Sequence, residues 1–139
     1  MQGAINQWST TLPKECIITD RDIIKGFETA TYRTKNTIAV ILKPINKKQV
    51  QIIVKIAQKY KAPLYPISTG KNWGYGSSVP TANNCALVDL GMMNNIVKFN
   101  EDLAFVTIEP GVTQQQLYDF LQVNNSQLWI DATGSSTQC

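Results

Sequence analysis

The sequence predicts an α+β domain in which helices flank a mixed β-sheet. Three short apolar runs rich in β-branched and aliphatic residues, at 38–42, 64–67 and 85–90, predict strands that share one sheet. Two further β-rich runs lie next to each other near residue 100 and predict an antiparallel hairpin. Amphipathic helical stretches stand between and after these runs. The strands therefore cannot all be parallel, and the class is α+β.

The first two predicted helices begin behind a capping residue. A short helix is expected from Thr19 or Asp20 to about Phe27, with apolar residues at helical spacing. The second begins at Asn46, whose side chain caps the helix, with Gln49 as its reciprocal partner. Its apolar face follows the spacing i, i+3, i+4, i+7 and is expected to pack on the sheet; it comprises Val50, Ile53, Val54 and Ala57. The lysines at 47, 48, 55 and 59 form its solvated side.

The second half of the chain contains the hairpin and a third helix. Polar residues 77–84 predict a surface connection between strands. The hairpin strands are 96–99 and 103–108, joined by a tight turn at 100–102. Thr113 with Gln116 predicts a capping box, and 124–125 ends the helix. The buried stripe of this helix is Leu117, Phe120 and Leu121.

Composition excludes several classes of function. The chain of 139 residues supports one core, and its net charge of +3 is too small to indicate nucleic-acid binding. Three cysteines without CxxC spacing predict reduced thiols, and the absence of histidine excludes Ser–His and Cys–His catalysis and the usual zinc sites. No apolar run reaches the roughly 20 residues of a membrane span, and the amino terminus lacks a signal-peptide pattern. The expected location is the cytoplasm.

A glycine-rich loop follows the second strand and is the strongest functional signal. Residues 66–76 read P-I-S-T-G-K-N-W-G-Y-G, so three glycines and several small side chains directly follow the predicted strand. Glycine allows backbone amides to approach an anion such as a pyrophosphate. The loop is not a GxxxxGK[ST] phosphate loop, and its G-x-x-x-G-x-G spacing is not the dinucleotide fingerprint GxGxxG. A surface turn that binds nothing is the alternative for this segment taken alone.

Two further segments accompany this loop in the same order along the chain. Residues 109–113 read E-P-G-V-T before a helix, and residues 131–136 read D-A-T-G-S-S. Together the three segments resemble the FAD-binding oxidoreductases related to vanillyl-alcohol oxidase and p-cresol methylhydroxylase, especially the 4-cresol dehydrogenase flavoprotein branch that oxidises para-alkyl phenols. The resemblance implies a PCMH-type FAD-binding fold. Residues 1–139 would be the amino-terminal part of one such domain, incomplete at its carboxyl end, with the substrate and cap domain outside it.

The resemblance also implies which residues hold FAD. The cofactor-binding residues would come from all three segments and comprise Ser68, Thr69, Gly70, Lys71, Asn72, Trp73, Gly74, Tyr75, Gly76, Pro110, Gly111, Val112, Thr133, Gly134, Ser135 and Ser136. Trp73 and Tyr75 would either pack beside the isoalloxazine or wedge the loop against its neighbours. Lys71 would either compensate phosphate charge or point to solvent. Asn72 stands where relatives with a flavin tethered through this loop carry histidine, so this position cannot form that bond.

The implied activity is oxidation of a para-substituted phenol or similar alcohol by hydride transfer to FAD. The flavin would carry the chemistry, and the partners would be FAD, a small aromatic or alcohol substrate, and an electron-acceptor protein or a second copy of the chain. No metal is expected, and no catalytic base is assigned, because Asp89, Glu109 and Asp131 have no visible partner. The rival interpretation is a non-catalytic remnant of the domain that acts as a binding or interaction module.

Overall fold

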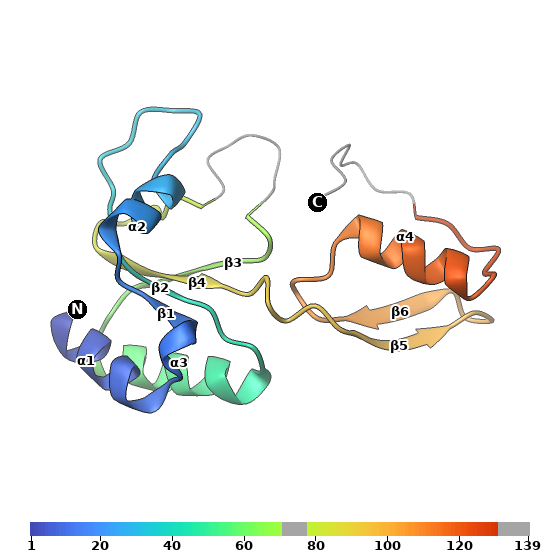
Figure 1. Ribbon diagram of the computed structural model, residues 1–139, viewed down its shortest axis with the longest axis horizontal. Helices are drawn as coiled ribbons and strands as arrows, with labels where there is room; N and C mark the ends of the chain where they lie inside the picture. Colours follow the sequence, from blue (N-terminus) through green and yellow to red (C-terminus); the bar gives the residue numbers. More distant parts are fainter. Residues whose placement is uncertain (71–77, 131–139) are drawn as a thin grey trace.

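A computed structural model describes residues 1–70 and 78–130 of the chain (Figure 1). The helices are α1 (Gln2–Thr11), α2 (Arg21–Phe27), α3 (Lys47–Tyr60) and α4 (Gln114–Val123), with a 3₁₀ turn at Lys14–Cys16. The strands are β1 (Ile17–Ile18), β2 (Ile38–Leu42), β3 (Leu64–Ile67), β4 (Cys85–Asp89), β5 (Ile96–Asn100) and β6 (Phe105–Ile108).

The first four strands form one mixed sheet in the order β1-β2-β4-β3. Strand β4 lies in the centre and pairs in parallel with both β2 and β3, with Leu42 opposite Val88 and Ile67 opposite Asp89. The predicted common sheet of 38–42, 64–67 and 85–90 is therefore confirmed. Strand β1 was not predicted, since it is two residues long and exists only through antiparallel pairing with β2.

Helices cover both faces of this sheet (Figure 1). On one face α1 and α3 pack over a core that includes Trp8, Val40 and Ala86. On the other face α2 places Ile24 over a second core that contains Ile41 and Leu87. We call the four-stranded sheet with α1, α2 and α3 the sheet lobe.

Helix α3 is rotated relative to the face that the sequence predicted. Ile53 and Ala57 are buried as expected, but Val54 is 49% exposed and Ile56 is buried in its place. One residue advances about 100° around an α-helix, so Val54 points well away from Ile53 while Ile56 and Ala57 lie on either side of it. Helix α1 determines this rotation by packing beside α3, and the indole of Trp8 donates to the Ile53 carbonyl oxygen at 3.3 Å.

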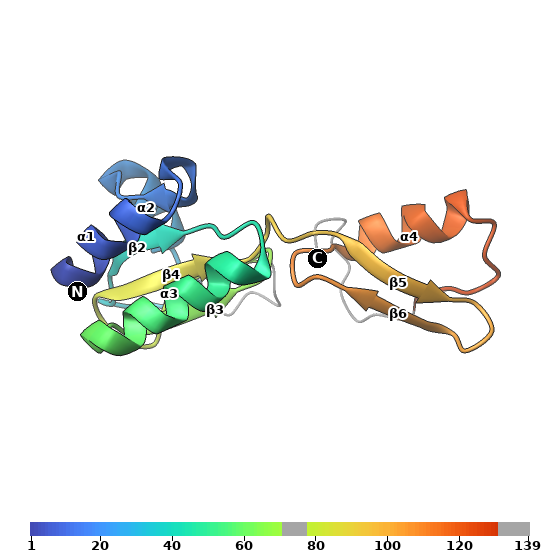
Figure 2. The same cartoon turned by 90° about the horizontal axis from the view of Figure 1, so that it is seen from below.

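The hairpin β5–β6 and helix α4 form a second unit, which we call the hairpin lobe. It extends to one side of the sheet lobe (Figure 2). Phe99 of β5 meets Phe120 of α4 edge to face, with ring centroids 5.4 Å apart. The turn occupies residues 101–104 instead of the predicted 100–102, because Ala104 takes a left-handed conformation at φ 49° and delays the start of β6.

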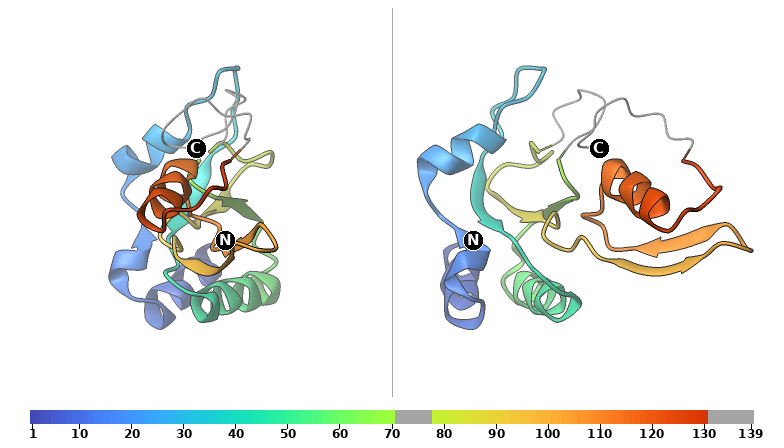
Figure 3. Two further views of the ribbon diagram at one scale, coloured as in Figure 1. Left: turned by 90° about the vertical axis from the view of Figure 1, so that its right-hand side faces the viewer. Right: turned by 45° about the vertical axis from the view of Figure 1, so that its right-hand side comes forward.

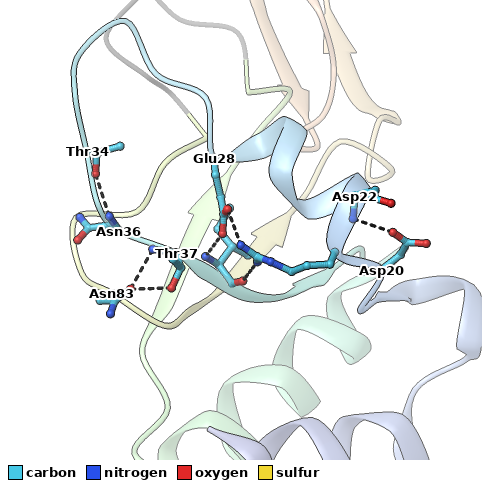
Figure 4. Close-up of polar contacts among 9 residues, drawn as sticks. Asp20, Asp22, Glu28, Thr34, Asn36, Thr37 and Asn83 are labelled. Carbon is cyan, nitrogen blue, oxygen red and sulfur yellow. Dashed lines mark hydrogen bonds and ion pairs between the residues drawn. The ribbon is translucent and has the colours of Figure 1, made fainter.

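The connection before β4 is more buried than its polar sequence predicts. Val79 and Pro80 are buried, although residues 77–84 were expected to form a surface connection. The cause is the neighbouring segment before β2. Asn36 donates its side-chain amide to the Pro80 carbonyl oxygen at 2.8 Å. Thr37 donates to the side chain of Asn83 (Figure 4).

Candidate cofactor site

The parallel strands β2, β4 and β3 end together at one edge of the sheet lobe. Lys43 follows β2, Asp89 ends β4, and Ser68 follows β3. The Leu90 amide donates to the Ile67 carbonyl oxygen at 3.0 Å, so β3 and β4 stay paired to this edge. In open α/β sheets ligands bind outside the carboxyl ends of the strands, which makes this edge the candidate site.

Two backbone segments cross at this edge where the lobes join. The Gly111 amide donates to the Met93 carbonyl oxygen at 2.8 Å. A Cβ atom at Gly111 would lie 2.5 Å from the Gly91 carbonyl oxygen and 2.7 Å from that of Leu90. Only glycine allows this close approach, so the crossing explains why position 111 of the E-P-G-V-T segment is a glycine.

The crossing brings two of the predicted cofactor segments together. The Ser68 hydroxyl donates to the Pro110 carbonyl oxygen, which links the start of the glycine loop to the turn at 110–112. Gly70 has a φ of 73°, as expected of a glycine at a sharp bend, and a Cβ atom there would lie 3.1 Å from the Ser78 hydroxyl. Ser68–Gly70 and Pro110–Val112 are thus neighbours in space although far apart in sequence.

The other predicted cofactor residues lie outside the described residues. These are Lys71, Asn72, Trp73, Gly74, Tyr75, Gly76, Thr133, Gly134, Ser135 and Ser136. Their assignment to FAD stays a prediction, and so does the assignment of the six residues that the structure places at the crossing.

Helix α4 begins directly after the Pro110–Val112 turn. Thr113 and Gln116 form the predicted capping box, with the Gln116 amide donating to the Thr113 hydroxyl at 3.1 Å and the Thr113 amide donating to the Gln116 side chain at 2.9 Å. The amino-terminal end of α4 points toward the sheet lobe (Figure 3). The positive end of its dipole therefore faces the junction, as suits a cofactor that carries phosphate.

The types of group at this edge of the sheet suit FAD. It combines a glycine with positive φ, a close crossing of two backbones, a small hydroxyl side chain and a helix amino terminus, all at the carboxyl edge of parallel strands. These features admit backbone close to a diphosphate and oppose its charge. A bulkier side chain at Gly111 would push the two segments apart.

The acids at the site have partners that the sequence did not reveal. One oxygen of Asp89 lies 3.1 Å from the Lys43 ammonium, and the other accepts from the Gly91 amide at 2.9 Å. Glu109 accepts from the backbone and side-chain amides of Asn95 at 2.9 and 2.7 Å. The expectation that both acids stand alone was wrong. Aligning the ends of the predicted strands could have paired Lys43 with Asp89.

The cysteines and the acids do not form a metal site in the described part of the chain. Residues 1–70 and 78–130 contain no group of three potential metal ligands. Burial raises the pKa of the thiols of Cys16 and Cys85, and both cysteines are free. A raised pKa disfavours the reactive thiolate form, so neither thiol is assigned a chemical role.

Comparison with known proteins agrees with the fold. The FAD binding domain family matches residues 38–139, and the fold is that of a domain of this class. The chain belongs to the FAD binding domain family, and its cofactor is FAD. Among solved structures, p-cresol methylhydroxylase with substrate bound superposes with a TM-score of 0.92 at 28% identity over 98% of this chain and 27% of that one. The PCMH-type fold is confirmed.

Two curated relatives show higher identity. The chain is 42% identical over 136 residues to 1'-carboxy-chondrochloren decarboxylase of Chondromyces crocatus, covering 98% of this chain and 25% of the relative. It is 41% identical over 88 residues to the 4-cresol dehydrogenase [hydroxylating] flavoprotein subunit of Pseudomonas putida, covering 63% and 17%. The chain thus spans a quarter or less of the length of these relatives. No helix within the described ranges is long and apolar enough to cross a membrane.

Proposed function

We propose that the whole protein is an FAD-dependent oxidoreductase that oxidises a para-substituted phenol. The observation that carries the proposal is the contact between Ser68–Gly70 and Pro110–Val112 at the carboxyl edge of the sheet. It is supported by similarity to two solved structures of enzymes that are named for para-alkyl phenols. One is p-cresol methylhydroxylase, and the other is 4-ethylphenol oxidase from Gulosibacter chungangensis, with a TM-score of 0.86 at 32% identity over 94% of this chain and 26% of that chain.

In this proposal the described residues bind and orient the cofactor. Bound FAD would supply the hydride-accepting chemistry, and the chain's own residues would hold it. The crossing at Gly111 and the first turn of α4 would lie against its diphosphate, and Gly70 would let the loop bend around it. Neither Asp89 nor Glu109 is placed to move a proton, since each carboxylate is engaged within the chain.

The test uses the full-length protein, purified and heat-denatured to release any bound flavin. We expect stoichiometric FAD in the supernatant. With the intact holoprotein under anaerobic conditions, 4-cresol or 4-ethylphenol should bleach the visible flavin absorbance, whereas 3-cresol should not. Protein without flavin would contradict the cofactor assignment. Flavin that no para-alkyl phenol reduces would contradict the substrate class alone, and reduction would rule out a non-catalytic binding module.

A matched pair of glycine variants tests the site itself. Gly111→Ala places a methyl group against two carbonyl oxygens at the crossing, and we expect it to lower FAD retention at least about tenfold. Gly26→Ala is the control, because a Cβ atom at Gly26 meets nothing within 4 Å. Equal FAD content in the two variants would show that the crossing does not form part of the cofactor site.

Decarboxylation is the second candidate function. It is favoured by the decarboxylase relative, which matches 98% of this chain at 42% identity. Release of carbon dioxide from para-hydroxyphenyl carboxylic acids such as 4-hydroxyphenylacetate would support it. Flavin bleaching by 4-cresol without carbon dioxide release from these acids would favour phenol oxidation instead.

A further inference from the structure

The ion pair between Lys43 and Asp89 lies at the base of the backbone crossing. Lys43 follows β2 and Asp89 ends β4, so the parallel pairing of these strands brings the two side chains to the same edge. The distance between the ammonium and the carboxylate is 3.1 Å. The Asp89 side chain is 11% exposed and that of Lys43 is 30% exposed, so the carboxylate is largely withdrawn from solvent.

Both oxygens of Asp89 are used. The second oxygen accepts from the Gly91 amide at 2.9 Å and thereby fixes the turn that leaves the sheet lobe. A carboxylate that bonds the amide two residues ahead stabilises such a turn, and Lys43 compensates its charge. The Lys43 backbone is fixed as well, because its amide donates to the Cys16 carbonyl oxygen at 2.8 Å.

The turn that Asp89 stabilises contacts the two cofactor segments at the crossing, Ser68–Gly70 and Pro110–Val112. Gly91 meets Gly111 at the crossing, and a Cβ atom at Gly91 would lie 3.7 Å from the Ser68 carbonyl oxygen. Ser68 in turn donates to the carbonyl oxygen of Pro110. A shift of Gly91 would therefore displace the start of the glycine loop and the Pro110–Val112 turn together.

We propose that Asp89, with Lys43 as its counterion, is a positioning residue that sets the distance between the two cofactor segments and so determines FAD affinity. The proposal rests on the proposed cofactor site. Neither side chain contacts the cofactor in this proposal; they act through the Gly91 turn. A misplacement of about 1 Å can cost an enzyme about a hundredfold in rate, and we expect FAD binding to be similarly sensitive to the spacing of the two segments when the Gly91 turn loses its anchor.

The chain contains a matched ion pair at the other end of the same strand. A guanidinium nitrogen of Arg21 lies 2.7 Å from one carboxylate oxygen of Glu28. The other oxygen of Glu28 accepts from the amide of Ile38 at 2.7 Å, where β2 begins (Figure 4). The Glu28 side chain is 13% exposed, close to the 11% of Asp89. Each carboxylate thus pairs with a cation and holds one backbone amide, but only Asp89 lies at the candidate cofactor site.

The experiment compares these pairs in the full-length protein. The flavin is removed, FAD is titrated back by fluorescence quenching, and the melting temperature of the flavin-free protein is recorded. Asp89→Ala, which removes the acceptor of the Gly91 amide, should raise the Kd for FAD about tenfold or more, and Glu28→Ala should leave it within about twofold at a similar loss of melting temperature. Lys43→Met should weaken FAD binding, and Lys43→Arg, which keeps the charge, should restore it.

The outcomes separate this proposal from the proposed function. A wild-type protein that does not bind FAD contradicts the proposed cofactor site. A wild-type protein that binds FAD, with Asp89→Ala and Glu28→Ala equal in Kd, overturns the positioning role alone. If Asp89→Ala does not fold, the Lys43 variants decide, because Lys43→Met leaves the largely buried Asp89 carboxylate without its counterion and so weakens its hold on the Gly91 turn. Equal Kd values for Lys43→Met and Lys43→Arg would then overturn the proposal.

Discussion

The two lobes bury their apolar residues to very different degrees. In the sheet lobe, Val40, Ile41 and Leu87 are completely buried between helices on both faces. In the hairpin lobe, Leu121 is the one buried hydrophobic residue that the structure describes within β5, β6 and α4. Val97 and Val123 are 64% and 82% exposed, and Trp129 just beyond α4 is 78% exposed.

The difference in burial indicates that the sheet lobe supplies most of the folding stability of this chain. A sheet covered on both faces has its own core, whereas a two-stranded hairpin depends on packing against its helix, and here that packing buries only Leu121 among the described residues of β5, β6 and α4. The hairpin lobe is therefore expected to open at a lower free energy than the sheet lobe. The candidate site lies at the junction, so it depends on the stable lobe for its anchor and on the weaker lobe for its second segment.

The largest effect is expected from a charge placed in the core of the sheet lobe. Ile53→Asp buries a carboxylate without a counterion and should lower the free energy of unfolding by roughly 3–5 kcal/mol. Val54→Asp on the same helix should change it by less than about 0.5 kcal/mol, since Val54 is 49% exposed. Thermal denaturation followed by circular dichroism checks both. Equal melting temperatures would show that the packed face of α3 is wrongly placed.

A pair of identical truncations compares the two lobes directly. Leu87→Ala empties a fully buried position and should cost about 4 kcal/mol, whereas Leu121→Ala should cost about 2 kcal/mol because its surroundings can close around the gap. Urea denaturation gives the two values. A larger cost for Leu121 would mean that the hairpin lobe has the better packed core.

Removal of the cap should loosen the hairpin lobe selectively. Thr113→Ala leaves the Gln116 amide without its acceptor and should destabilise α4 by about 1 kcal/mol. Hydrogen exchange should show faster exchange of α4 amides with unchanged protection of β2 and β4. Faster exchange in both lobes would indicate that they unfold as one unit.

The smallest expected effect is a stabilisation. Gly26→Ala replaces a helical glycine where a new methyl group meets no atom within 4 Å, and it should raise the stability of the sheet lobe by about 0.5 kcal/mol. A modest rise in melting temperature checks this. A fall would show that α2 requires the freedom of glycine at this position.

Local signals in the sequence were enough to predict most of the fold. The strands at 38–42, 64–67 and 85–90 and the capped helices after Asp20, Asn46 and Thr113 are confirmed, because β-rich runs and capping residues act over a few positions. Helix α1 was missed, since its fully buried residues are only Ala4 and Trp8, one turn apart in a polar stretch. Such a helix depends on packing against α3.

The capping of α3 shows a similar limit. Asn46 accepts from the Gln49 amide as predicted, at 3.0 Å, but the Gln49 side chain accepts from the Ile45 amide instead of that of Asn46. The motif predicts that the two side chains cap this end of the helix. Which backbone amide the Gln49 side chain reaches depends on the path of the chain into the helix. The sequence spacing of the capping motif does not specify that path.

The sequence was enough to propose which segments form the candidate site. It was not enough to predict how those segments contact one another. The glycine loop was identified from its residue types, and the E-P-G-V-T turn was assigned to the site from its resemblance to the FAD-binding oxidoreductases. The link from Ser68 to Pro110 and the pair of Lys43 with Asp89 follow from strand register and from the crossing at Gly91. Register is a property of paired strands, so no single run of residues reveals it.

The position of β4 has a consequence for synthesis of the chain on the ribosome. Strands β2 and β3 do not pair with each other, because β4 lies between them, yet β4 is made last of the three. Until residues 85–89 emerge, the apolar strand Ile38–Leu42 has no parallel neighbour. At roughly 5–20 residues per second, synthesis from the end of β3 to the end of β4 takes on the order of seconds. During that interval nascent β2 and β3 both present open edges to chaperones, and the glycine-rich segment that separates β3 from β4 determines how long the wait lasts.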